Sequence, residues 1–317
     1  MLAPAVTGPR SWTASTVDDP RCWRYSLPDA CWAPFETVRE SNRKAPRPLT
    51  QIRLSNALSS EFTRALEPMR TALESGRGFA IVQAPAGPTL GGEDLRLLYW
   101  LVGQGLGRPV EQNVQGTLLY DVRDMGQDLT KGARVSVTNY ESSFHTDNSF
   151  GTKVVDYVGL LCLQTAKSGG RSQVASGFAV YNELYARHPE VLETLKRPFH
   201  VDRRGGVREG EAATIQFPVI SGNESELLFR YLRYWIEAGH EKVGQPLTST
   251  QVTALDLLDE VLNRPDLRAE FDLTPGDMYF INNRWILHNR TAFEDYPEPE
   301  RRRHLVRLWL QASLVGT

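Results

Sequence analysis

The chain has 317 residues, of which 41% are hydrophobic and 23% are charged, and these proportions exclude a fibrous or disordered chain. Its 36 basic and 38 acidic residues give a net charge of -2, so no overall positive field attracts nucleic acid or an anionic membrane. The 3 cysteines have no metal-finger spacing and fit a reducing compartment. The first residues lack the features of a signal peptide, and no apolar run approaches the roughly 18 residues of a membrane span. We therefore expect a cytoplasmic protein that has neither nucleic acid nor a membrane as a partner.

The N-terminal part of the chain differs in pattern from the rest. Residues 1–50 are rich in proline, tryptophan and polar side chains without a clear period, so we expect an irregular arm there and a single domain over residues 51–317. Apolar residues at three- and four-residue steps predict an amphipathic helix over 55–75, followed by a buried strand over 78–82. A second helix is predicted over 94–105.

Strand patterns dominate the remaining two thirds of the chain. Strands are expected over 134–138 and 154–163, and a turn at 168–171 leads into a further strand. The other predicted elements are a helix over 179–195, strands over 199–201, 214–220 and 227–231, a helix opened by the capping box at 248–251, and strands over 271–273, 278–282 and 304–310. The predicted helices lie mostly in the first part of the chain, and strands suited to antiparallel pairing lie mostly in the later part. This order predicts a β-sandwich or open barrel with helices on the outside.

The candidate chemistry begins at a His-x-Asp pair, His145 and Asp147. In extended backbone, residues i and i+2 point to the same side, so the imidazole and the carboxylate can converge on one metal ion. A second histidine, His288, follows the apolar strand over 278–282. Two neutral imidazoles and one carboxylate leave other coordination positions open, as in non-haem iron(II) oxygenases. The alternatives are a surface histidine beside a turn-forming aspartate, or a zinc-dependent hydrolase, for which no motif supplies a glutamate base.

The last strand carries two arginines among apolar residues. With a period of two, Arg303, Leu305, Arg307 and Trp309 share one face. Because an unpaired buried charge costs several kcal/mol, an arginine on that face needs an anion. Either a bound carboxylate or an acidic side chain of this chain can supply it.

Taken together, these residues resemble the taurine dioxygenase (TauD/TfdA-like) family of iron(II)/2-oxoglutarate dioxygenases. The resemblance lies within residues 75–312 and includes the stretches 144–147, 159–161, 168–172, 275–277 and 287–290. It implies an α+β fold with a double-stranded β-helix (jelly-roll, cupin-like) core flanked by helices. It also implies that His145, Asp147 and His288 bind Fe(II), and that Ser172 with Arg303 or Arg307 binds 2-oxoglutarate. Serine stands where the family has threonine, which keeps the hydroxyl donor.

The activity that this resemblance implies is oxidation of an unactivated C–H bond of a small metabolite. Fe(II), 2-oxoglutarate and O2 are the implied cofactor and co-substrates, and succinate and CO2 are released. Hydroxylation is the expected outcome, and desaturation, cyclisation or oxidative cleavage in a natural-product pathway uses the same chemistry. A catalytically silent binding protein of the same fold is the alternative of a different class. We expect a carboxylate-bearing or amino-acid-like substrate.

Overall fold

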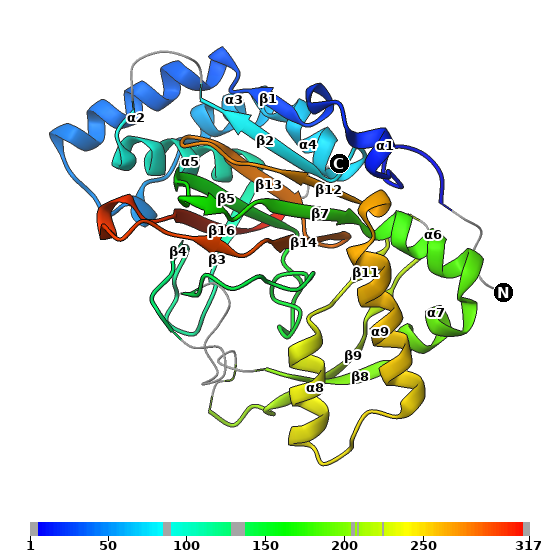
Figure 1. Ribbon diagram of the computed structural model, residues 1–317. Helices are drawn as coiled ribbons and strands as arrows, with labels where there is room; N and C mark the ends of the chain where they lie inside the picture. Colours follow the sequence, from blue (N-terminus) through cyan, green and yellow to red (C-terminus); the bar gives the residue numbers. More distant parts are fainter. Residues whose placement is uncertain are drawn as a thin grey trace.

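Two β-sheets lie at the centre of the molecule, and helices cover the outer face of the larger one (Figure 1). The computed structural model describes residues 6–84, 90–127, 137–203, 207, 209–223 and 225–312. The larger sheet has seven strands in the order β1-β2-β13-β5-β16-β3, and β4 also pairs with β16. These strands are β1 (Arg24–Ser26), β2 (Phe79–Gln83), β3 (Gly107–Val110), β4 (Leu119–Val122), β5 (Tyr157–Gln164), β13 (Met278–Asn282) and β16 (His304–Ala312).

The smaller sheet has the strand order β12-β7-β14, and all its pairs are antiparallel. It consists of β7 (Ser172–Ser176), β12 (Arg268–Phe271) and β14 (Ile286–Arg290). The short strands β6 (Ser168–Gly169) and β15 (Phe293–Glu294) pair beside it. The predicted jelly-roll core with flanking helices is therefore confirmed.

Alternation along each strand sends side chains to two separate cores. On β13, Tyr279 and Ile281 belong to the cluster that also contains Val174 of the smaller sheet. Met278 and Phe280 belong to the cluster under the helices. Because successive residues of a strand point to opposite faces, one apolar sequence serves both layers.

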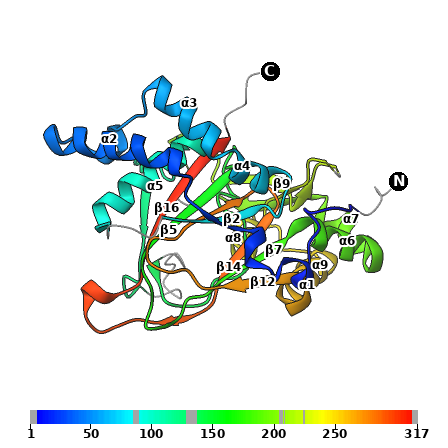
Figure 2. The same cartoon turned by 90° about the horizontal axis from the view of Figure 1, so that it is seen from above.

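Helices lie over the outer face of the larger sheet, as Figure 2 shows from above, and their apolar residues share one core with its strands. They are α2 (Trp32–Lys44), α3 (Asn56–Ala65), α4 (Glu67–Glu74) and α5 (Gly92–Leu106). The approach of α5 to β16 requires a glycine, because a Cβ at Gly103 would lie 2.3 Å from a methyl carbon of Leu308. A larger residue at position 103 would therefore force the Leu308 side chain or the helix to shift.

A second group of elements forms the lower lobe in Figure 1. It contains α6 (Gly177–Arg187), α7 (Pro189–Leu195), α8 (Arg233–Lys242), α9 (Ser249–Asn263), β8 (Pro198–Asp202), β9 (Thr214–Pro218), β10 (Ile220–Ser221) and β11 (Leu228–Phe229). The predicted capping box opens α9: Gln251 N donates to Thr248 Oγ1 (3.2 Å) and Thr248 N donates to Gln251 Oε1 (3.0 Å).

Several expectations differ from the structure. The helix predicted over 55–75 is divided at Leu66, and the one over 179–195 at His188, because Pro68 and Pro189 begin new helices. Helix α8 was not expected. The predicted strand over 134–138 falls largely outside the described residues.

The expectation of an irregular arm over residues 1–50 is wrong for part of that segment. It contains the helix α1 (Ala14–Val17), the 13-residue helix α2, and β1, which pairs in parallel with β2. Proline at position 34 is compatible with α2 because it lies in the first turn, where the missing N–H has no helical partner. No helix among the described residues is both long and apolar enough to cross a bilayer.

Candidate active site

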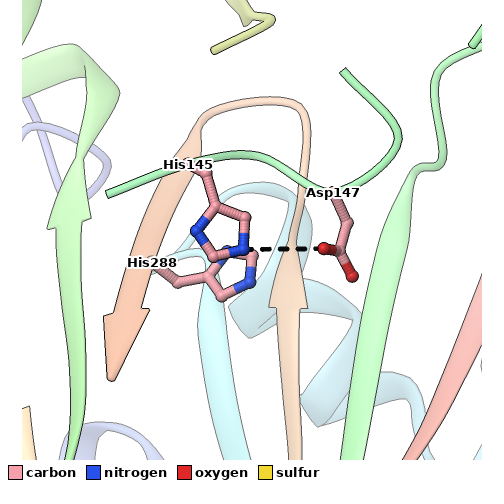
Figure 3. A group of neighbouring side chains, drawn as sticks. All are labelled: His145, Asp147 and His288. Atoms are coloured by element: carbon pink, nitrogen blue, oxygen red, sulfur yellow. Dashed lines mark ion pairs between the residues drawn. The ribbon is translucent and has the colours of Figure 1, made fainter. Parts of the chain in front are cut away.

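Backbone pairing brings the two predicted histidine ligands together. His145 N donates to His288 O and His288 N donates to His145 O, each at 3.0 Å. In such an antiparallel pair the two side chains stand on the same side, and here the ring centroids are 4.3 Å apart (Figure 3).

The segment after His145 is fastened so that alternate side chains point in opposite directions. Thr146 Oγ1 donates to Phe229 O (3.2 Å) in the lower lobe. Asp147 N donates to Asn283 Oδ1 (2.7 Å), and Asn283 Nδ2 donates to Asp147 O (3.0 Å). The carboxylate of Asp147 is thereby directed to the same side as the imidazole of His145, as the His-x-Asp spacing predicts.

His145, Asp147 and His288 together form a compact group of metal donors. One donor atom from each residue lies within 4.8 Å of the others, and His145 Nε2 is 3.7 Å from Asp147 Oδ1 (Figure 3). His145 Nδ1 lies 2.8 Å from Ser143 O, and only a protonated nitrogen can donate to a carbonyl. His145 Nε2 therefore keeps its lone pair for a metal ion.

The second oxygen of Asp147 is already occupied. Trp309 Nε1 donates to Asp147 Oδ2 at 2.8 Å, and Arg307 Nη1 lies 3.2 Å from the same oxygen. Arg307 Nε donates to Gln112 Oε1 at 2.8 Å, which fixes the guanidinium. Asp147 Oδ1 faces His145 Nε2 at 3.7 Å and has only a longer contact with Arg307 Nη1, at 3.4 Å, so it is the oxygen better placed to bind a metal ion.

Electrostatics keep the three donors in the protonation states that metals bind. Burial lowers the pKa of His288 to about 3, helped by the neighbouring His145, and burial also lowers the pKa of His145. Burial alone would raise the pKa of Asp147, but the charge of Arg307 and the two histidines outweigh it and lower that pKa to about 2. Two neutral imidazoles and an ionised carboxylate are thus in place, which fits Fe(II).

A pocket between the two sheets adjoins this group of donors. Ser172, Tyr279, Arg290 and Arg303 line it. Four of its buried polar atoms have no hydrogen-bond partner among the described residues: Tyr279 Oη, His288 Nδ1, Arg290 Nε and Arg303 Nη1. Because an unpaired buried polar group is costly, this clustering fits a ligand rich in acceptor oxygens, such as a dicarboxylate.

Arg307 lies in β16 and Arg303 directly precedes this strand, and the two side chains have different contacts. Arg303 is 5% exposed and its Nη1 is unpaired within the described part of the chain, whereas Arg307 is engaged with Asp147 and Gln112. The predicted alternation is confirmed, since Arg303, Leu305 and Arg307 line the same pocket.

A second pocket also borders His145 and Asp147. Aromatic side chains form part of its wall: Trp235 from the lower lobe, Trp309 from the larger sheet, and Phe150 from the segment after Asp147. Neutral polar residues such as Gln112 and Asn148 form another part. His145, Asp147 and Arg307 also line this pocket, so both pockets border two of the three donor residues.

Known proteins share this arrangement of elements and motifs. The model of the Taurine catabolism dioxygenase TauD, TfdA family matches residues 45–309. The chain belongs to this family. The dioxygenase is 30% identical over 320 residues to FR-33289 synthase of Streptomyces rubellomurinus, covering 99% of this chain and 92% of that protein. It is 33% identical over 169 residues to the taurine hydroxylase-like protein SAT17 of Stachybotrys chartarum, covering 52% of this chain and 41% of that protein.

Solved structures of the same fold extend the comparison. Asparagine oxygenase in complex with Fe(II), 2S,3S-3-hydroxyasparagine and succinate aligns with a TM-score of 0.67 at 18% identity, over 91% of this chain and 93% of that one. Non-heme iron oxygenase OrfP in complex with Fe and alpha-ketoglutaric acid also gives 0.67 at 18% identity, over 92% and 94%. The prediction of a 2-oxoglutarate-dependent non-haem iron dioxygenase with Fe(II), 2-oxoglutarate and O2 is confirmed.

Sequence reasoning missed several residues of the dioxygenase that lie around the donors. Trp309 was predicted to share a face with Arg307, but its hydrogen bond to Asp147 was not predicted. Tyr279 and Asn283 were interpreted only as parts of an apolar strand and of the turn after it. Arg290 follows His288 by two residues, so the same alternation that placed Asp147 beside His145 was the available signal for it.

Proposed function

We propose that this dioxygenase hydroxylates an unactivated C–H bond of a small metabolite with an anionic or amino-acid-like group, using His145, Asp147 and His288 as iron ligands. The observation that carries the proposal is the convergence of these three donors beside two pockets, one of which contains Arg303 Nη1, a buried donor without a partner in the described ranges. When bound, Fe(II) supplies activation of O2 driven by oxidative decarboxylation of 2-oxoglutarate to succinate and CO2. The residues of the chain orient the two organic substrates and keep water out.

We assign 2-oxoglutarate to the pocket between the sheets. Arg303 Nη1 is buried and lacks a partner within the described residues, so a distal carboxylate there satisfies it. A planar guanidinium binds a carboxylate through two parallel hydrogen bonds, and Ser172, which lines the same pocket, offers a further hydroxyl. Arg307 is instead assigned to holding Asp147 in place, because its Nη1 and Nε are directed to Asp147 and Gln112.

The metabolite is assigned to the second pocket, where the aromatic wall meets the donors. Arg290, Arg303 and Arg307 outnumber Asp147 among the charged residues that line the two pockets. The charges of Fe(II) and of the 2-oxoglutarate dianion cancel, so a net positive charge remains at the centre. That charge favours a substrate with an anionic group. An amino-acid-like substrate also agrees with the hydroxylated asparagine held by the structurally similar asparagine oxygenase.

The test uses the purified protein with Fe(II). Under anaerobic conditions, addition of 2-oxoglutarate should produce the visible absorption of its chelate with iron, and His288→Ala should abolish it. Under air, succinate should form from 2-oxoglutarate, faster with a substrate from a panel of carboxylates and amino acids. Mass spectrometry then separates gain of one oxygen atom, which is hydroxylation, from loss of two hydrogens, which is desaturation. An iron-loaded protein that gives neither the absorption nor succinate would contradict the proposal and favour a silent binding protein.

A further inference from the structure

Tyr279 contributes a buried hydroxyl group to the lining of the pocket that we assign to 2-oxoglutarate. The residue is 2% exposed, and its Oη has no hydrogen-bond partner among the described residues. Phenylalanine would fill the same apolar space without burying a polar atom, so this tyrosine carries a cost that packing does not explain.

The strand register places Tyr279 on the same face of the larger sheet as other residues that line this pocket. Tyr279 of β13 lies opposite Leu160 of β5, and Leu160 lies opposite Arg307 of β16. Residues directly opposite each other in neighbouring strands face the same side of a sheet. All three side chains line the pocket, which agrees with this register.

A row of paired residues in the smaller sheet lines the opposite side of this pocket. Ser172 of β7 lies between Phe271 of β12 and Arg290 of β14. The ring of Phe271 meets the ring of Tyr279 edge-on, with centroids 5.2 Å apart. Tyr279 thus projects from the larger sheet toward the row that contains Ser172.

We propose that the Tyr279 hydroxyl donates a hydrogen bond to the distal carboxylate of 2-oxoglutarate, beside Arg303 and Ser172. This assignment rests on the proposed function, which places that carboxylate between the sheets. Burial raises the pKa of Tyr279 well above its usual value, so the hydroxyl keeps its proton and remains a donor. The residue then positions the co-substrate and takes no part in the oxidation itself.

The test is Tyr279→Phe, measured by anaerobic titration of the Fe(II)-loaded protein with 2-oxoglutarate. The dissociation constant should rise about tenfold, because a hydrogen bond to a charged group is lost. The matched probe is 2-oxobutyrate, which has the same 2-oxo acid end and no distal carboxylate, and its dissociation constant should not change. Tyr99→Phe is the control variant: Tyr99 is also fully buried but belongs to the core under the helices, so both dissociation constants should stay at the wild-type values.

Thermal unfolding of the metal-free variants separates binding from folding. Metal-free Tyr279→Phe should unfold at the wild-type temperature or above it, because no protein partner is lost. A lower unfolding temperature, equal weakening of both 2-oxo acids, or unchanged affinity for 2-oxoglutarate would each overturn the assignment. A wild-type protein that binds neither acid would instead overturn the proposed function, and the assignment with it.

Discussion

Trp309→Phe tests how Asp147 is oriented. The indole Nε1 donates to Asp147 Oδ2 at 2.8 Å, and both residues are buried, at 4% and 7% exposure. A hydrogen bond to a charged group contributes about 1.5–3 kcal/mol, and 1.4 kcal/mol corresponds to about a tenfold change in a dissociation constant. Because Arg307 keeps its ion pair with the same oxygen, we expect the lower end of this range. The dissociation constant for Fe(II) should therefore rise about tenfold, within the range of about 10–100-fold typical of residues that support metal ligands.

Anaerobic calorimetric titration of the metal-free protein with Fe(II) gives this number directly. Trp23→Phe is the matched control, since Trp23 is also buried and its indole also donates one hydrogen bond, to Val17 O at 2.9 Å, far from the donors in the sequence. It should lose stability in the same way and bind Fe(II) as the wild type does. If Trp309→Phe binds Fe(II) as tightly as the wild type, the orientation of Asp147 does not depend on the indole and the reasoning is wrong.

Three further substitutions probe neighbouring contacts. Arg303→Lys should raise the apparent KM for 2-oxoglutarate by about tenfold or more in a succinate assay, because lysine cannot form the bidentate contact; an unchanged KM would place the anchor elsewhere. Asp147→Ala should abolish Fe(II) binding in calorimetry. It should also lower the free energy of unfolding of the metal-free protein in urea by on the order of 3 kcal/mol, because Arg307 loses its carboxylate partner. A stability equal to that of the wild type would show that Arg307 finds another partner. Asn283→Ala should cost about 3 kcal/mol in the same unfolding assay, since its fully buried amide bonds Asp147 N, Asp147 O and Val155 O; unchanged stability would mean that water replaces the amide.

The parts of this site that the sequence predicts are those set by local geometry. The i, i+2 spacing of His145 and Asp147 and the alternation along β16 follow from extended backbone alone. The pairing of His288 with His145 was inferred from chemistry, because the sheet register that joins them is not local. The positions of Pro68 and Pro189 explain why two predicted helices are divided. The apolar periodicity continues across both prolines, so periodicity alone predicts one uninterrupted helix in each case.

Contacts across long sequence separations escaped prediction. Arg307 and Trp309 reach Asp147 across about 160 residues, and nothing in the strand sequence says which acceptor each would find. Arg307 was expected to be available for 2-oxoglutarate, whereas in the structure its guanidinium contacts Asp147 and Gln112. Tyr279 reads as an ordinary strand aromatic, because only three-dimensional packing shows whether a hydroxyl has a partner.

The hydrogen bonds of Thr146 connect the segment that carries His145 and Asp147 to the lower lobe. Its hydroxyl donates to Phe229 O, accepts from Tyr231 N, and so ties the segment between the two donors His145 and Asp147 to the lower lobe. The same lobe supplies Trp235 to the wall of the second pocket, to which we assign the substrate. A substitution that loosens the lobe should therefore shift both the proposed iron ligands and the aromatic wall of the second pocket, even when the substituted residue contacts neither.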